Sequence, residues 1–263
     1  LVSIRLPVPS IETQRQIVDA FEAQNSKLDA ATAGLRRTQA NLKRYRASVL
    51  KAAVEGRLVP TEAELARQEG REYEPASMLL ERILKERRRR WEEAELAKMT
   101  AKGKVPKDDG WKARYVEPAG PDASRLPDLP EGWCWAAIGQ LASVGTGTTP
   151  NREITRFWEG GDTPWVTSSV VNSSEVTEPS EFVTSAALRE TNLSLYPPGT
   201  ILMAMYGEGR TRGRATVLGI SSTTNQALAA LCLDMEADCL RKWMLLALEN
   251  NYEQTRRMSS GGV

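Results

Sequence analysis

Three arginines at alternate positions form the densest basic cluster in the C-terminal half of the sequence. Arg210, Arg212 and Arg214 lie in the glycine-rich run YGEGRTRGR, residues 206–214. In an extended segment alternate side chains share one face, so the three guanidinium groups would lie side by side. Arginine donates paired hydrogen bonds to phosphate oxygens and to the guanine edge, and such a partner would offset the crowded charge. The spacing therefore indicates an anion-binding face; the alternative is a solvated basic hairpin in which Glu208 pairs with one arginine.

Two further loops carry short polar side chains of the types that contact phosphates and base edges. One is the glycine-rich segment 147–152, and the other follows the run PWVT, residues 164–167. Glycine allows a backbone to approach a ligand closely because it has no β-carbon. Taken singly, each of these residues is also typical of an ordinary turn. With the aromatic residue that opens the arginine run, the additional candidate contacts to phosphates or base edges are Thr148, Thr149, Asn151, Arg152, Ser168, Ser169 and Tyr206.

The chain contains no histidine. This excludes serine–histidine and cysteine–histidine catalysis and the common histidine-containing metal motifs. The three cysteines are odd in number and form no CxxC pair, so we expect free thiols and no disulfide framework at Cys134, Cys232 and Cys239. Carboxylates remain available for acid–base chemistry or for Mg²⁺, but no paired spacing stands out. We therefore predict no catalytic residue and no metal site in this chain.

Cofactor motifs are also incomplete. The run GTGTTP, residues 145–150, lacks the last glycine of a dinucleotide-binding loop. The run GEGRTRG, residues 207–213, lacks the lysine of a P-loop. The run YPPGT, residues 196–200, superficially resembles the catalytic corner of amino-methyltransferases, but Tyr196 stands where that chemistry needs Asp or Asn. We instead expect a Pro-Pro-Gly turn that leads into a strand.

Composition is that of an ordinary soluble protein, with 41% hydrophobic and 26% charged residues, and neither a membrane span nor a signal peptide is predicted. Charge is unevenly distributed. Residues 131–263 hold ten basic and fourteen acidic residues, a net charge of −4, whereas residues 1–130 hold 25 and 20, a net charge of +5. The C-terminal half is not generally basic, so any anion that it binds must meet a local cluster.

The first half is helical in pattern. A seven-residue hydrophobic repeat predicts a long coiled-coil helix that begins after Ser10 and ends near Gly56. We call the residues of this repeat the seam: Phe21, Leu28, Leu35, Leu42 and Val49. Their partner is expected elsewhere in the full protein or in another chain. The alternative is an amphipathic helix that lies on the second half of the chain.

A second helix is expected over about 75–99, with Arg87 to Arg90 forming a solvated face paired with flanking glutamates. Residues 101–130 have the composition of a linker. From about residue 129, short β-type runs are separated by turns, and one helix is expected over about 238–254. The fold class is therefore α+β: a long coiled-coil helical arm followed by a β-rich globular domain.

Several segments, in order, resemble type I restriction–modification specificity subunits. The first set resembles the central conserved region of that family: LPVPSIETQRQIV, LKAAVEGRLVP and EPASMLLERILKER. The second set is similar to one target-recognition domain: LPEGWCWAAIGQLASVGTGTTP, GGDTPWVTS, LYPPGTILMAMYG, STTNQALAAL and SSGGV. The resemblance extends over essentially the whole chain and depends on the order and spacing of the segments, since no single motif is decisive.

The resemblance implies a domain plan. Residues 1–10 would end a preceding recognition domain, 11–100 would form the helical spacer, 101–130 a linker, and 131–263 a DNA-binding target-recognition domain. In this family the helices form an antiparallel coiled coil and dock methyltransferase subunits, and each recognition domain binds half of a split target. The chain lacks a complete first domain and the closing helix, so we expect a fragment or a half-subunit that pairs with itself.

The resemblance also implies a role without catalysis. The partners would be double-stranded DNA, methyltransferase subunits and a restriction subunit in the prokaryotic cytoplasm, with no membrane. S-adenosylmethionine, ATP and Mg²⁺ would bind to those partner subunits and no cofactor to this chain. Thr224, Asn225 and Gln226 match a family landmark, and we expect them to brace neighbouring loops. Two other hypotheses remain: a coiled-coil scaffold without DNA specificity and, less favoured, a Mg²⁺-dependent nuclease.

Overall fold

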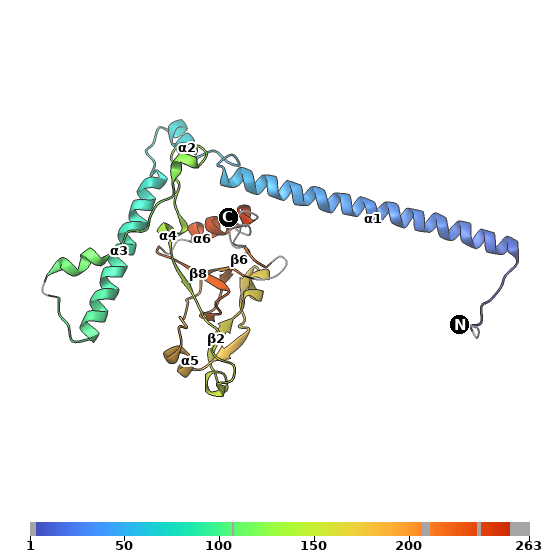
Figure 1. The fold of residues 1–263 in the computed structure, drawn as a ribbon. Coiled ribbons are helices and arrows are strands. Elements are labelled where there is room, and N and C mark those ends of the chain that lie inside the picture. Colours follow the sequence, from blue (N-terminus) through green and yellow to red (C-terminus); the bar gives the residue numbers. More distant parts are fainter. Residues whose placement is uncertain (1–3, 107, 207–210, 236–237, 253–263) are drawn as a thin grey trace. The chain divides into compact units, whose positions relative to one another are not determined.

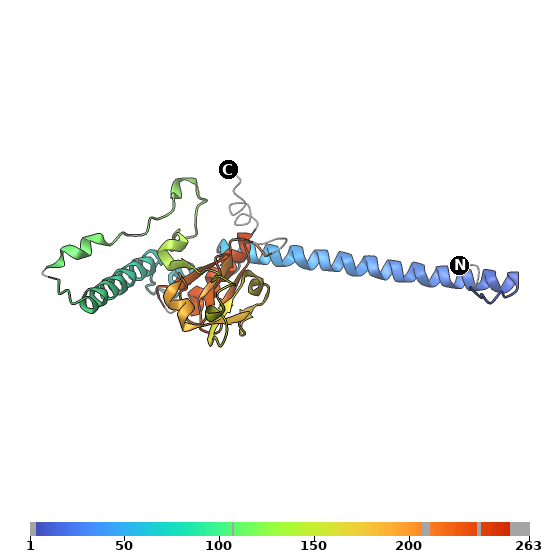
Figure 2. The same ribbon diagram turned by 60° about the horizontal axis from the view of Figure 1, so that its bottom comes forward.

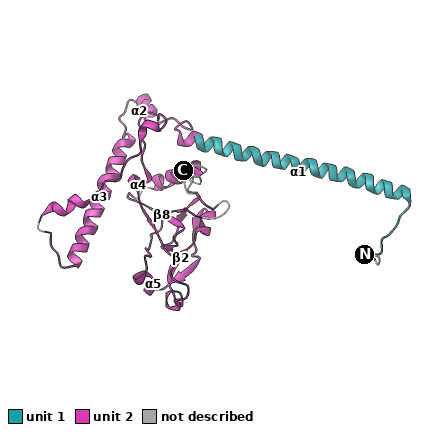
Figure 3. Ribbon diagram, in the orientation of Figure 1, with its two compact units in different colours: residues 1–51 teal, residues 52–263 magenta. Residues whose placement is uncertain are grey.

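The computed structural model describes residues 4–106, 108–206, 211–235 and 238–252 (Figure 1). The chain divides into two compact units, residues 1–51 and residues 52–263 (Figure 3). Within the described ranges, no helix combines the length and apolar character that a bilayer span requires.

Residues 1–51 contain most of helix α1, Ile11–Val54. Ser10 opens the helix, because its hydroxyl oxygen accepts a hydrogen bond from the Thr13 amide at 3.3 Å. Beyond its end, Gly56 adopts a φ of 68°, a left-handed conformation that favours glycine. The predicted helix is confirmed. No residue of α1 is buried, and the first four seam residues are 63–72% exposed. What the seam packs against stays a prediction.

Residues 52–263 begin with two helices, α2 at Glu62–Glu69 and α3 at Ala76–Ala101. Thr61 caps α2 through a reciprocal hydrogen-bond pair with Glu64, and Gly70 ends it at a φ of 66°. Ile83 of α3 is 1% exposed. These helices lie in the same compact unit as the strands, although the sequence assigns them to the spacer. The predicted domain boundaries stay predictions.

The segment predicted as a linker contains two short 3-10 helices, η1 at Asp109–Arg114 and η2 at Ala123–Arg125. The η1 segment returns along α3 (Figures 1 and 2). There, the Trp91 ring lies 6.0 Å from the Trp111 ring and 5.3 Å from the Tyr115 ring. This part of the linker therefore packs against α3 through aromatic contacts.

A five-stranded sheet forms the centre of the C-terminal part, in the order β1-β8-β5-β6-β3. The pairs are antiparallel except for β3 with β6. The strands are β1 Ala142–Thr146, β3 Glu175–Val176, β5 Ile201–Ala204, β6 Ala215–Leu218 and β8 Leu228–Leu233. The Pro-Pro-Gly turn before β5 is confirmed, with Gly199 at a φ of 87°.

Successive side chains of β5 pack into two different hydrophobic cores. Ile201 packs with Leu231 and with Met244 and Leu248 of α6, which is described over Asp238–Asn250. Leu202 belongs to a second cluster. Adjacent strand residues point to opposite faces, so both faces of the sheet are covered. On the first face lie α6 and the short helix α4, Ile138–Leu141, which also contacts α3.

A second, three-stranded sheet has the order β4-β2-β7. Its strands are β2 Thr163–Val166, β4 Glu181–Val183 and β7 Thr223–Thr224. Trp165 and Val183 pack in a third core with residues of η3, Thr155–Phe157, and of α5, Ser185–Glu190. The remaining 3-10 helix, η4, spans Ser168–Asn172 and follows β2. The predicted α+β class, a long helix followed by a β-containing globular region, is confirmed.

Candidate nucleic-acid interface

Strand register brings the predicted contact loops to one end of the five-stranded sheet. Thr146, the last residue of β1, pairs with Ala229 near the start of β8. Ala204, the last residue of β5, pairs with Leu228, and Met203 pairs with Ala215 at the start of β6. The segments after β1 and β5 therefore lie beside those before β6 and β8.

The second sheet adds its own loops to the same end. The Asn225 amide donates to the Val166 carbonyl at 3.0 Å, and Trp165 Nε1 donates to the Thr148 carbonyl at 3.1 Å. Thr149 Oγ1 donates to Gln226 Oε1 at 2.8 Å. We call this collection the loop end. Its described segments are 147–152, 167–172, 204–206, 211–214 and 224–227.

The arginine run differs from the extended arrangement that its spacing suggested. Arg210 lies outside the described residues. Arg212 and Gly213 form a turn, in which the Arg214 amide donates to the Thr211 carbonyl at 3.1 Å and Gly213 has a φ of 83°. The expectation of one extended face is wrong for Arg212 and Arg214, because a left-handed glycine stands between them. Tyr206, at the start of the run, is 60% exposed.

Arg214 and Arg212 have different surroundings. Nη1 of Arg214 donates to Oδ1 of Asn172 at 2.8 Å, so its described partner is a neutral amide. Nε of Arg212 is buried and has no hydrogen-bond partner among the described residues. Neither guanidinium forms an ion pair with a carboxylate within the described ranges. Their charge is therefore not offset by any side chain that the structure describes.

Arg152 is paired instead with a carboxylate. Its guanidinium forms a two-bond contact with Glu181 of β4, with Nη2 to Oε1 at 2.7 Å, and lies 3.7 Å from the Trp158 ring centroid. Hydrogen bonding to Arg152 lowers the pKa of Glu181, and the same bond raises the pKa of Arg152. These contacts join segment 147–152 to β4. A DNA contact by Arg152 stays a prediction.

The η4 segment carries Ser168 and Ser169. Val171 is 3% exposed and anchors the segment in the core. Ser169 Oγ lies 2.8 Å from Thr167 Oγ1, and the Ser169 carbonyl accepts a hydrogen bond from Nδ2 of Asn172 at 3.1 Å. Asn172 was not predicted from the sequence. Its role depends on Arg214, 42 residues away, and no local pattern marks that pairing.

The Thr-Thr-Asn-Gln cluster braces the loops. Thr224 is fully buried, and a β-carbon at Gly147 would lie 1.7 Å from its carbonyl oxygen, so the two backbones touch. Asn225 Oδ1 accepts from the Ala227 amide at 3.1 Å. Bracing of a neighbouring loop by a side chain is therefore observed for Gln226, which bonds to Thr149. Thr224 contacts Gly147 through its backbone, and the Asn225 side chain bonds within its own turn. Burial is confirmed for Thr224 only, because Gln226 is exposed and braces Thr149 from the surface.

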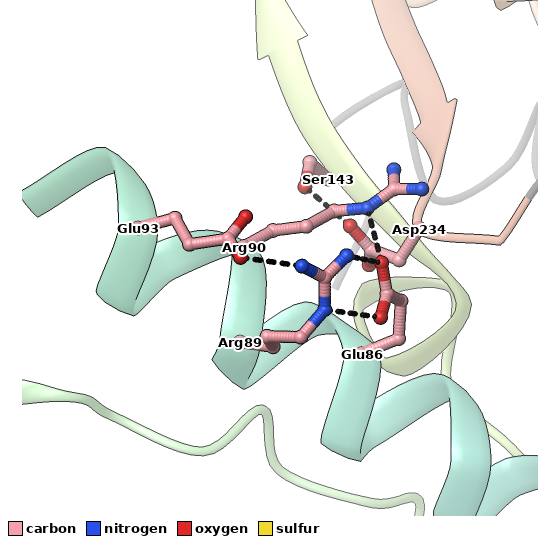
Figure 4. Close-up of polar contacts among 6 residues, drawn as sticks. All are labelled: Glu86, Arg89, Arg90, Glu93, Ser143 and Asp234. Carbon is pink, nitrogen blue, oxygen red and sulfur yellow. Dashed lines mark hydrogen bonds and ion pairs between the residues drawn. The ribbon is translucent and has the colours of Figure 1, made fainter. Parts of the chain in front are cut away.

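The basic run on α3 divides into two parts. Arg88, Arg89 and Arg90 pair with glutamates of the same helix, and Glu86 accepts from both Arg89 and Arg90 (Figure 4). These two donors lower the pKa of Glu86 to about 2. The expectation of a solvated, glutamate-paired face is confirmed for these three arginines.

Arg87 contradicts that expectation. Its Nη1 reaches Oδ2 of Asp234 at 2.8 Å and the carbonyls of Gly139 and Ala142 at 2.5 and 3.1 Å. Ser143, drawn beside Asp234 in Figure 4, donates to Oδ1 at 3.0 Å. Arg87 points toward the sheet because Ile83, one helical turn earlier, is buried on that side of α3.

Other candidate chemistry is sparse in the described part of the chain. There, His, Cys, Asp and Glu residues do not gather in any group of three or more that would suit a metal ion. Cys134, Cys232 and Cys239 are free thiols, as predicted.

The chain is similar in sequence to the specificity subunits of type I restriction enzymes, which confirms the resemblance drawn from its motifs. One curated relative is the type I restriction enzyme MjaIX specificity subunit of Methanocaldococcus jannaschii. It is 32% identical over 96 residues, which are 35% of this chain and 21% of the relative. No family model matches the chain.

Solved structures give a distant likeness. The HsdS subunit from Thermoanaerobacter tengcongensis aligns at 18% identity and a TM-score of 0.39, over 96% of this chain and 44% of that one. A chain from a structure on complex assembly and conformational transition of a type I R-M system aligns at 22% identity and a TM-score of 0.39, over 76% and 44%. The chain thus spans less than half the length of each of these three proteins.

Proposed function

We propose that this chain is the DNA-recognition part of a type I restriction–modification specificity subunit. The observation that carries the proposal is the loop end. Segments far apart in sequence bring predicted contact residues to one surface: Thr148, Thr149, Ser168, Ser169, Tyr206, Arg212 and Arg214. The sequence relationship to a specificity subunit supports the same role.

The chemistry of this surface suits a DNA duplex. Arg214 bears a charge that no described carboxylate offsets, and arginine binds phosphates and the guanine edge with paired hydrogen bonds. The hydroxyls of Thr148, Thr149 and Ser168 are short donors and acceptors suited to phosphates and base edges. Because residues 131–263 are net acidic, binding would depend on this local cluster, and nonspecific attraction by the rest of that half would be weak.

The helical part would supply assembly. The seam of α1 exposes 63–72% of Phe21, Leu28, Leu35 and Leu42, a hydrophobic stripe of the kind that a partner helix covers. In this proposal the helices space two recognition domains on a bipartite target and direct methyltransferase and restriction subunits to it. Those subunits perform the chemistry with S-adenosylmethionine, ATP and Mg²⁺.

Methylation mapping tests the proposal. The chain, in the full-length protein that carries it, is expressed with its methyltransferase subunit, and methylated positions are located across a genome. We expect one recurring target sequence, and exchange of Arg212 or Arg214 for glutamine should reduce or alter methylation at that target. Arg189→Gln is the matched control, because Arg189 is an exposed arginine of α5, beyond the far end of β4.

The alternative outcome is a scaffold. If the assembled complex shows no preference for any duplex, and partner binding survives loss of both arginines, DNA recognition by this chain is refuted. The exposed seam is the observation that would then favour a protein-interaction role.

A further inference from the structure

We infer that Asn172 is a positioning residue that orients Arg214 toward DNA without offsetting its charge. Glu181, in contrast, offsets the charge of Arg152, so Arg152 does not supply that contact. The inference rests on the proposed function and deepens it, because it specifies which arginine of the loop end supplies the charge-dependent contact. It follows from the different partners that the fold gives to Arg152 and Arg214.

The first observation is the chemistry of the two partners. Glu181 carries a negative charge and binds the Arg152 guanidinium with two hydrogen bonds, which offsets its charge locally. Asn172 accepts one hydrogen bond from Arg214 through a neutral amide oxygen at 2.8 Å. A neutral acceptor orients a guanidinium without cancelling its field, so Arg214 keeps its attraction for a phosphate or a guanine edge.

The second observation is how the Asn172 amide is oriented. Its Nδ2 donates to the Ser169 carbonyl at 3.1 Å, while its Oδ1 faces Arg214. Rotation of the amide by 180° would place an N–H group against the guanidinium and an oxygen against a carbonyl, and both contacts would be repulsive. Only one orientation therefore satisfies both partners, and it is the one that accepts from arginine.

The third observation is that the Asn172 side chain stands on an anchored segment. Val171 is 3% exposed, and Thr216 of β6 donates to the Ser173 carbonyl at 2.8 Å. Asn172 therefore links η4 to the turn before β6. As a result, Ser168 and Ser169 are held in a defined relation to Arg214.

Arg214 keeps enough donors to bind a ligand. A guanidinium has five N–H donors, and the Asn172 bond uses one of them. A bidentate contact to a phosphate or to guanine needs two more. Arg152 also keeps three donors, but it differs because the Glu181 carboxylate offsets its charge, and its guanidinium carbon lies 3.7 Å from the Trp158 ring centroid.

The test is the salt dependence of DNA binding, measured on the methyltransferase complex with a duplex that contains the mapped target. Asn172→Asp replaces the neutral acceptor with a carboxylate. We expect binding about 10- to 100-fold weaker, as for loss of one bidentate arginine contact. The slope of log K against log salt should become shallower by about one.

Three further variants separate charge from position. Arg214→Gln should lower the slope by the same amount as Asn172→Asp, and the double variant should lower it no further. Asn172→Ala adds no charge, so it should keep the wild-type slope but reduce the ratio of target to nonspecific binding. Glu181→Gln removes the carboxylate at Arg152 and should not make the slope shallower.

Thermal unfolding of each variant checks that the domain is folded. A shallower slope in a folded Asn172→Asp variant therefore reports the added charge and not a loss of structure. The outcomes are distinct. If the wild-type complex binds no duplex preferentially, the proposed function fails. If it does bind its target, and Asn172→Asp keeps the wild-type salt slope, Asn172 does not control the charge of Arg214 and the inference is overturned.

Discussion

Loss of the Arg87 guanidinium should strongly destabilise the C-terminal part of the chain. Arg87 is 22% exposed and its partner Asp234 is 7% exposed, so water screens the pair poorly. Arg87 also donates to the carbonyls of Gly139 and Ala142, and Asp234 also accepts from Ser143. Arg87→Met keeps a side chain of similar length and helix propensity but leaves the carboxylate and both carbonyls without that donor.

The size of the effect follows from this geometry. Removing one partner of a buried ion pair costs about 3–5 kcal/mol, mainly because the remaining charge is uncompensated. Arg87 is partly exposed, so water can reach the vacated space, and we expect the lower end, about 3 kcal/mol. For a domain of this size each kcal/mol corresponds to about 2–4 °C, so the melting temperature should fall by about 6–12 °C.

The assay is thermal or urea unfolding of the whole chain, followed by circular dichroism. Arg89→Met is the matched control, because Arg89 lies on the same helix and pairs with Glu86 and Glu93 at an exposed position. It should change the free energy of unfolding much less, since solvent screens such pairs. The double variant Arg87→Met with Asp234→Leu should recover part of the loss. If Arg87→Met proves no more destabilising than Arg89→Met, the contacts of Arg87 with Asp234 and the two carbonyls do not hold α3 to the sheet.

Three further predictions concern the loop end. Gly147→Ala should destabilise the chain by about 1–3 kcal/mol or more in urea unfolding, because its β-carbon would lie 1.7 Å from the Thr224 carbonyl oxygen, whereas Gly139→Ala, with no atom within 4 Å, should have little effect. Thr224→Val should leave stability unchanged or raise it by up to about 1 kcal/mol, because its buried hydroxyl has no hydrogen-bond partner among the described residues; a loss of more than about 1 kcal/mol would show that the hydroxyl is bonded. The carboxyl of Glu181 should titrate by NMR below its ordinary pKa of 4.5, because Arg152 stabilises the ionised form, and Arg152→Gln should raise that pKa. Since the folded-state pKa of Glu181 is lowered, its small stabilising contribution is present above pH 4.5 and is lost as the pH falls through the folded-state value; an unchanged titration in the variant would contradict the pairing.

Local patterns predicted the helical elements well. The seven-residue repeat and the capping signal at Ser10 place α1 within one or two residues of its observed bounds, Ile11–Val54. The expected second helix, about 75–99, agrees with α3 at Ala76–Ala101. Helix periodicity and end signals depend on residues within a few positions of one another, so they are present in the sequence itself.

Candidate site residues were predicted by type but not by partner. The loops with glycine, threonine, serine and arginine do converge, because strand ends carry the turns and register brings those ends together. Arg152 was predicted without Glu181, which lies 29 residues away, and Arg87 without Asp234, which lies 147 residues away. Neither pairing has a local signature, since each depends on which strands are neighbours.

By itself, the sequence determined the α+β class, the long helix with its hydrophobic seam, the free thiols and the motifs shared with specificity subunits, all of which depend on local spacing or composition. Only the tertiary structure decided which arginines at the loop end carry an offset charge. Arg152 meets a carboxylate because β4 pairs with β2, and Arg214 meets an amide because η4 packs against β5 and β6. Whether the charge of an arginine is offset depends on its neighbours in space. For these two residues the neighbours are set by sheet register and packing.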